Sequence, residues 1–148
     1  MRDTPEAGKP KTILAFDFGL RRIGVAVGQQ VTGSAGPIGT VHNRDDGVDH
    51  AAIAAIVDEW QPDRLVVGMP LHADGSDSEL KPRVEAFIGE LRRFGLPIDT
   101  VDERYSSIEA ERVLKQARTM GTRGRIRKEA VDSAAAVVIA ERYLAACE

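Results

Sequence analysis

Residues 13–27 read ILAFDFGLRRIGVAV. The apolar run that ends at Phe16 has the composition of a buried strand, and Gly19 to Arg22 form a turn before a second apolar run. The stretch therefore predicts a β-hairpin with Asp17 at the end of its first strand. A carboxylate at that place is costly unless it is paired or holds a metal, although Asp17 and the glycine can also serve the turn alone.

Beyond the hairpin, the chain predicts one more strand and then alternating helices and strands. Pro37 suggests that the third strand is an edge strand or carries a bulge. Periodic apolar residues predict the helices, and short apolar runs predict the strands. We expect strands at 35–41, 64–68 and 97–101, helices at 49–60, 84–91, 106–117 and 129–146, and loops at 69–77 and 118–128.

This order indicates an α/β protein with a mixed five-stranded sheet. Short links between the first three strands imply antiparallel pairing, whereas helical crossovers before the last two imply parallel pairing, with helices on both faces. The last predicted helix is apolar nearly all round, which indicates a buried helix. We expect a disordered tail at 1–11 and a single domain at 12–148.

Composition narrows the class of protein further. The net charge of -3 gives no global argument for a polyanionic partner, so nucleic acid would need a local basic patch or a metal. The single cysteine, Cys147, excludes an intramolecular disulfide and suits a reducing cytosol. The polar N-terminus lacks the apolar region of a signal peptide, and no apolar run is long enough to span a membrane. We therefore expect a cytoplasmic protein.

Two further carboxylates stand at places where a fold can bring distant residues together. Glu103 follows the strand predicted at 97–101, and alternation would send it and Asp102 to opposite sides. Asp132 lies among alanines near the start of the last helix. Each has a simpler explanation, an acidic turn for Glu103 and stabilisation of the helix dipole for Asp132. Together with Asp17, they form a possible divalent-metal site.

Candidate contacts to nucleic acid come from the loops and the hairpin turn. The 69–77 loop follows a strand end and could contact a phosphate through Ser76, and Arg22 is expected to be exposed beside Asp17. Five cations gather in an otherwise acidic chain and suit backbone phosphates, although a solvated charged loop is the ordinary alternative. They are Arg118, Arg123, Arg125, Arg127 and Lys128.

Four blocks of this sequence together resemble the YqgF family, whose members are Holliday-junction-resolvase-like proteins regarded as nucleases of pre-16S ribosomal RNA. The blocks are 17–26, 66–76, 102–107 and 132–136. The resemblance implies a ribonuclease-H-like fold, with Asp17, Glu103 and Asp132 as its acidic triad. Family members often carry another acidic residue after the second strand, where this chain has Gln29 and Gln30.

The same resemblance implies a hydrolase that cleaves phosphodiester bonds with Mg²⁺ or Mn²⁺. The expected process is maturation of the 5′ end of pre-16S ribosomal RNA, and the first alternative is resolution of branched DNA by a Holliday-junction resolvase. Residues 17–27 also look like the first phosphate loop of actin-like ATPases, which would require dimerisation at this length. A non-catalytic RNA-binding module is the third reading. The sequence leaves a monomer and a homodimer equally open.

Overall fold

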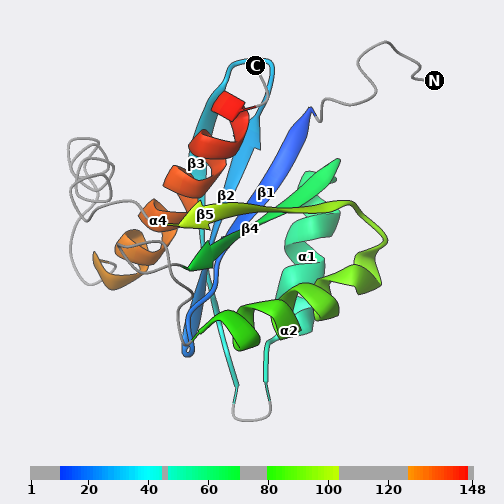
Figure 1. Ribbon diagram of the computed structural model, residues 1–148, viewed down its shortest axis with the longest axis vertical. Helices are drawn as coiled ribbons and strands as arrows, with labels where there is room; N and C mark the ends of the chain where they lie inside the picture. The colour runs from blue at the N-terminus through cyan, green and yellow to red at the C-terminus, as the bar shows by residue number, and fades with distance from the viewer. Residues whose placement is uncertain (1–10, 45–46, 71–79, 104–126, 147–148) are drawn as a thin grey trace.

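The computed structural model describes residues 11–44, 47–70, 80–103 and 127–146, with backbone alone at 103 and 127–132. Within these residues one sheet runs in the order β3-β2-β1-β4-β5 (Figure 1). The first three strands pair antiparallel, and β1, β4 and β5 pair parallel, as the sequence predicted. The strands are β1 (Thr12–Asp17), β2 (Arg22–Gln29), β3 (Ser34–His42), β4 (Arg64–Pro70) and β5 (Ile98–Glu103).

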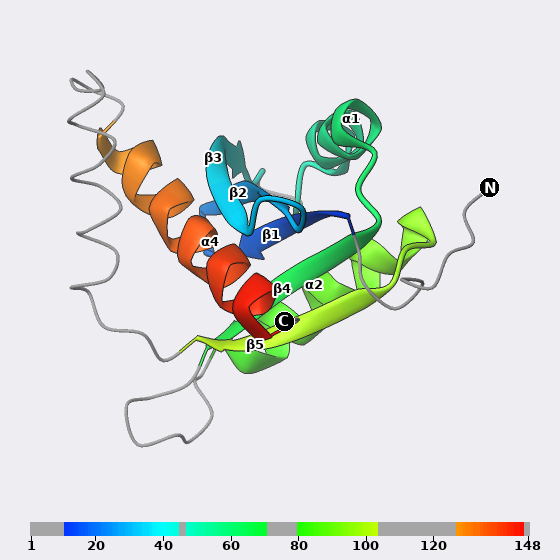
Figure 2. The same ribbon diagram turned by 90° about the horizontal axis from the view of Figure 1, so that it is seen from above.

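Helices cover both faces of the sheet, which confirms the predicted layers. Helices α1 (His50–Trp60) and α2 (Lys81–Leu91) lie on one face, and α2 continues into the short 3-10 helix η1 (Arg92–Phe94). Helix α4 (Arg127–Ala146) crosses the opposite face (Figure 2). No helix in the described part of the chain is long and apolar enough to cross a membrane.

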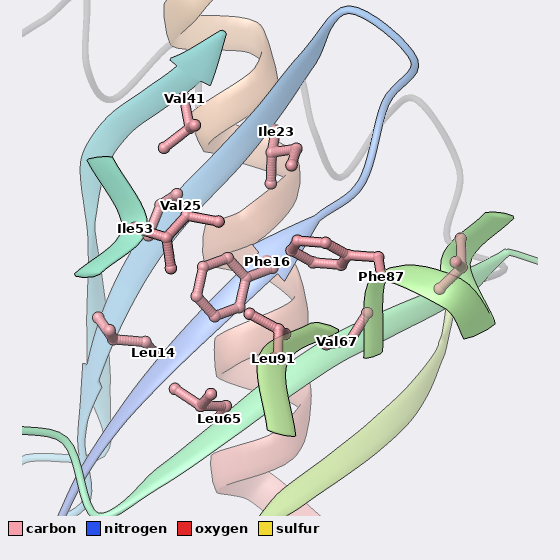
Figure 3. Packing of buried hydrophobic residues seen from close by; sticks show 11 residues of the cluster. Leu14, Phe16, Ile23, Val25, Val41, Ile53, Leu65, Val67, Phe87 and Leu91 are labelled. Atoms are coloured by element: carbon pink, nitrogen blue, oxygen red, sulfur yellow. The ribbon is translucent and has the colours of Figure 1, made fainter. Parts of the chain in front are cut away.

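The larger core lies between the sheet and the helices α1 and α2 (Figure 3). Phe87 of α2 packs edge-on against Phe16 of β1, with ring centroids 5.7 Å apart, and tilted against Phe18 at 5.3 Å. Such aromatic pairs stabilise a core beyond the area that they bury. They hold the middle of α2 against the end of β1, on either side of Asp17 in the sequence.

The smaller core lies under α4 and is built from small residues. All residues from 133 to 140 are buried, which confirms the buried helix predicted from the alanine-rich sequence. Ile139 and Leu144 pack with Ile13 of β1, and Ala134 packs with Ala26 of β2. Small side chains let the helix backbone approach the sheet closely, so residues 133–140 hold α4 against β1 and β2.

The edge strand β3 carries the irregularity that Pro37 indicated. Val25 of β2 pairs with Gly39, but the next residue, Ala26, pairs with Pro37, so one extra residue of β3 forms a bulge. Gly39 has a φ of 149°, a backbone conformation that side chains with a Cβ rarely adopt. The prediction that this strand is an edge strand or carries a bulge is confirmed, and β3 has both features.

Several predicted boundaries were wrong. Met69 and Pro70 belong to β4 rather than to the following loop, and β5 extends through Glu103, because Met69 pairs with Asp102 and Pro70 with Glu103. Arg127 and Lys128 belong to α4 rather than to the basic loop. Lys11 is held to the fold through its backbone N–H, which donates to Asp63 Oδ2 at 3.1 Å. The rest of the expected tail, the helix at 106–117 and the loop at 71–77 lie outside the described residues.

Candidate active site

Asp17 is the last residue of β1 and is partly buried. It pairs with Gly24 of β2, which pairs in turn with Thr40 of β3. On the other side, Asp17 lies one residue beyond the pair formed by Phe16 and Val67 of β4. The carboxyl ends of β1, β4 and β5 therefore share one edge, the edge at which open α/β sheets bind their ligands.

The position of Asp17 also fixes the face of the sheet on which it lies. Strand residues alternate between faces. Ile13 and Ala15 pack against α4, whereas Leu14 and Phe16 pack in the core under α1 and α2. Asp17 continues the series of Ile13 and Ala15, so it lies on the α4 face.

The same period places the end of β5. Val101 packs with the α4 cluster, and Asp99 accepts a hydrogen bond from Tyr143 of α4. Position 103 continues this series along the strand, whereas Asp102 is exposed and belongs to the other series. Of the two neighbouring acidic positions, register thus assigns the α4 face to Glu103.

Helix α4 brings its first turns to the same edge. The Ser133 hydroxyl donates to the carbonyl oxygen of Gly39 at 3.0 Å, and Gly39 adjoins Thr40 in the row that contains Asp17. Asp132 directly precedes Ser133 in the chain. The backbone positions of the three predicted carboxylates therefore lie at one end and on one face of the sheet, with β1 two strand spacings, or about 10 Å, from β5 on one side and from β3 on the other.

Three carboxylates suit a hard divalent cation such as Mg²⁺ or Mn²⁺, which prefers oxygen ligands. Among the described side chains, no three His, Cys, Asp or Glu residues form a metal-binding group, and that set does not include Glu103 and Asp132. The fit of the metal thus rests on the chemistry of the donors and on the backbone arrangement.

The predicted contacts to nucleic acid fall into two groups. Arg22 opens β2, pairs with His42 and is partly buried at the same end of the sheet as Asp17. Arg127 and Lys128 are the first two residues of α4, so they lie in the first turn of the helix that carries Asp132. Ser76, Arg118, Arg123 and Arg125 lie outside the described residues.

The turn after Asp17 is held in place by a residue that the sequence did not reveal. Asn43 Nδ2 donates to the carbonyl oxygens of Gly19 and Leu20 at 3.0 and 2.9 Å, and the Asn43 backbone N–H donates to Arg21 at 2.9 Å. A Cβ on Gly19 would lie 2.5 Å from the carbonyl oxygen of Arg22, so this turn requires glycine. Asn43 is 24 residues from Gly19, and no local pattern indicates their contact.

A second polar cluster lies at the amino ends of the parallel strands, away from Asp17. Asp99 Oδ2 accepts hydrogen bonds from Tyr143 and from Arg64, both at 2.6 Å. The Tyr143 hydroxyl, reinforced by the Arg64 guanidinium, holds the pKa of the Asp99 carboxyl below its usual range. Asp99 in turn raises the pKa of Arg64. This cluster connects the C-terminal part of α4 to β4 and β5 through the carboxylate of Asp99 and the guanidinium of Arg64.

Two comparisons with known sequences bear on the identity of this site. Residues 11–146 match the family RuvX, described as Holliday junction resolvase. A protein of Chromohalobacter salexigens named "Putative pre-16S rRNA nuclease" is 47% identical over 141 residues, which cover 95% of this chain and 93% of the relative.

Solved structures extend the comparison to the fold alone. The Fowlpox virus resolvase, crystallised with Holliday junction DNA, superposes with a TM-score of 0.60 at 11% identity, over 92% of this chain and 98% of that one. Thermus thermophilus RuvC with a Holliday junction substrate gives a TM-score of 0.54 at 14% identity, over 92% and 94% of the two chains. The mixed sheet with helices on both faces is therefore the architecture of these resolvases. This confirms the predicted ribonuclease-H-like fold.

Proposed function

This chain belongs to the Holliday junction resolvase family RuvX, and from that premise we propose that it is a nuclease of pre-16S ribosomal RNA. One observation carries the proposal. The ends of β1 and β5 and the first turns of α4 lie at the same end of the sheet, which supports a common site for Asp17, Glu103 and Asp132 on the face that α4 covers. Clustered carboxylates repel a phosphodiester by themselves, so their use on such a substrate requires a cation between them.

The proposed mechanism is hydrolysis of a phosphodiester at this edge. Asp17, Glu103 and Asp132 would hold Mg²⁺ or Mn²⁺, which would neutralise charge on the phosphoryl group and acidify the attacking water. Arg22 stands at the same end of the sheet and would bind a neighbouring phosphate. Asn43 holds the turn between Asp17 and Arg22, so the carboxylate and the cation keep a fixed separation.

Branched DNA is the second candidate substrate. The description of the matching family and the two resolvases of the same fold favour it. The relative with 47% identity, by contrast, is named for ribosomal RNA, and it is far more similar in sequence than either resolvase. We therefore place precursor ribosomal RNA first.

The deciding experiment supplies purified protein and Mn²⁺ or Mg²⁺ with precursor 16S ribosomal RNA and with a four-way DNA junction in parallel. We expect Asp17→Asn, Glu103→Gln and Asp132→Asn each to abolish cleavage, with non-additive losses because the three groups act as one unit. Asp58→Asn is the matched control, since Asp58 is an exposed carboxylate of α1 on the other face. Unimpaired cleavage by well-folded Asp17→Asn would remove Asp17 from the site.

Binding of the metal is measured separately from cleavage. Mg²⁺ or Mn²⁺ at millimolar concentration should raise the melting temperature of the wild-type protein by mass action on the folded state. The shift should vanish in Asp17→Asn and persist in Asp58→Asn. If neither the free protein nor its complex with substrate binds the cation, the metal-dependent mechanism is wrong.

A further inference from the structure

Ser133 is a polar residue on the otherwise apolar buried surface of α4. It is 3% exposed, and all the other buried residues that α4 contributes to the described core are apolar. Its hydroxyl donates to the Gly39 carbonyl at 3.0 Å, across 94 residues of sequence. A buried hydroxyl is tolerated when it is hydrogen-bonded, so this contact explains how Ser133 fits but not why the helix uses a polar residue there.

The acceptor lies at the bulge of β3. Gly39 is the residue at which the pairing with β2 shifts, and the extra residue of the bulge interrupts the regular ladder of backbone hydrogen bonds. A bulge is a unique feature along a strand, whereas the regular ladder on either side repeats every two residues. A hydrogen bond to this carbonyl therefore specifies one position of α4 along β3.

Near Ser133, the other contacts of α4 with the sheet do not specify its position so closely. They are made by small apolar residues such as Ala134, Ala136 and Val137, and apolar burial is non-directional. A hydrogen bond demands a particular distance and angle. At the far end, Arg142 Nη1 donates to the carbonyl oxygen of Asp102 at 3.4 Å and Tyr143 donates to Asp99, so these directional contacts lie nine and ten residues along the helix from Ser133.

We propose that Ser133 is a positioning residue for Asp132. The Ser133–Gly39 hydrogen bond fixes the axial position and rotation of the first turns of α4, and thereby sets where Asp132 stands relative to Asp17 at the end of β1. This inference rests on the proposed nuclease site and adds to it a residue that touches neither substrate nor metal. A misplacement of about 1 Å at a reacting group can cost on the order of a hundredfold in rate.

The test compares two variants that each remove one hydrogen bond of α4. Ser133→Ala removes the bond beside Asp132, and Tyr143→Phe removes one of the two bonds at the far end. We expect Ser133→Ala to lower kcat at least tenfold with little change in KM, and to weaken Mg²⁺ binding measured by calorimetry without substrate. Tyr143→Phe should keep kcat within twofold of the wild-type value. Both are assayed well below the lower of the two melting temperatures.

Melting temperatures separate positioning from a general loss of stability. If both variants lose stability to a similar extent but only Ser133→Ala loses kcat and metal affinity, the positioning role stands. Equal kcat for the two variants would overturn it. Should Ser133→Ala fail to fold, Ser133→Cys carries the test, because a thiol is nearly as small and is a weaker donor. It should then show an intermediate loss of kcat.

Asp132→Asn in the same assay distinguishes failure of this inference from failure of the proposed function. If Asp132→Asn is inactive and Ser133→Ala behaves like the wild type, only the positioning role is wrong. If Asp132→Asn cleaves normally, Asp132 is not part of the site, and both the proposed triad and the role of Ser133 are overturned.

Discussion

Thr40 and Ser133 are two buried hydroxyls close to the bulge of β3, and they differ in their hydrogen bonding. Ser133 has a partner in Gly39. The Thr40 hydroxyl is buried without a hydrogen-bond partner among the described residues, in the row that runs through Gly24 to Asp17. An unsatisfied buried hydroxyl destabilises a fold, typically by about 1–3 kcal/mol.

Replacing Thr40 by valine tests this cost. Valine keeps the shape of the side chain and removes the unpaired hydroxyl, so Thr40→Val should raise the free energy of unfolding by about 1 kcal/mol. Urea denaturation measures the change. Thr100→Val on β5, where the threonine is exposed, should alter stability by less than about 0.5 kcal/mol. A less stable Thr40→Val protein would show that the hydroxyl is satisfied in solution, for instance by water.

The same variant carries information about the site. The row on the α4 face joins Thr40 to Asp17 through Gly24, which has no side chain to separate them. If the Thr40 hydroxyl contacts substrate or its water, Thr40→Val would gain stability and lose cleavage rate together. Such opposite effects are typical of polar groups kept for activity.

At the scale of elements, α4 is held to the parallel strands by charge as well as by apolar burial. Asp99 of β5 joins Tyr143 of α4 and Arg64 of β4. Because Asp99 has a lowered pKa in the folded state, the folded protein binds a proton there less readily than the unfolded chain does. Its contribution to stability is therefore fully present above the pKa of an unfolded aspartate and is lost as the pH falls through the folded-state pKa.

Asp99→Asn should remove this pH dependence. We expect the wild-type protein to lose more stability than Asp99→Asn when the pH is lowered from 6 to about 3, in urea titrations at fixed ionic strength. Asp58→Asn provides the comparison for an exposed carboxylate. Parallel loss in wild type and Asp99→Asn would mean that solvent screens the cluster completely, since the Asp99 side chain is 39% exposed.

The elements that sequence periodicity and apolar runs define were predicted well. The antiparallel and parallel pairing of the strands, an edge or bulge at β3 and the buried α4 all follow from local composition and from connection lengths. The strand ends were not predicted, because Met69-Pro70 and Asp102-Glu103 have the composition of loops and are held extended by pairing with each other. Arg127 and Lys128 were placed in a loop with the other basic residues, whereas they begin α4, although cations are unfavourable at a helix N-terminus.

Candidate site residues could be proposed from the sequence where they stand near the ends of elements. Asp17 ends an apolar run, and Asp132 interrupts an alanine-rich one. Asn43 and Ser133 escaped notice because their partners are 24 and 94 residues away, and only the folded sheet brings them together. The one local indication that Ser133 has a special role was its polar side chain within the apolar stretch of the predicted buried helix.

For the whole molecule, charge limits how a polyanion can approach. The chain carries a net charge of -3, so attraction to nucleic acid must come from a local group of cations. Arg127 begins the helix that carries Asp132, and Arg123 and Arg125 directly precede it in the sequence. Contacts to phosphates at these arginines would supply affinity without sequence preference.

Replacing Arg123, Arg125 and Arg127 together by alanine should weaken binding to every sequence and flatten its dependence on salt. Three lost phosphate contacts reduce the slope of log K against log salt by about 2 for single-stranded RNA and about 3 for duplex DNA. Filter binding or fluorescence anisotropy across salt concentrations measures the slope. Mg²⁺ binding should survive, since no proposed ligand is changed.

A matched triple variant controls for the change of net charge. Arg83, Arg92 and Arg93 are exposed on α2 and η1, over the opposite face of the sheet, and their replacement by alanine removes the same charge. This variant should keep the wild-type salt slope. Equal slopes for both triple variants would show that the arginines before α4 are only a solvated surface.

The place of α4 in the chain has a consequence for biosynthesis. The strands β1, β2 and β3 leave the ribosome first, yet the face that they build is covered by the last helix, Arg127–Ala146. Domains fold as their chains emerge, at about 5–20 residues per second. The three strands therefore have no cover for this face until α4 has also been synthesised. Cleavage that depends on Asp132 would accordingly begin only after α4 has packed on the sheet.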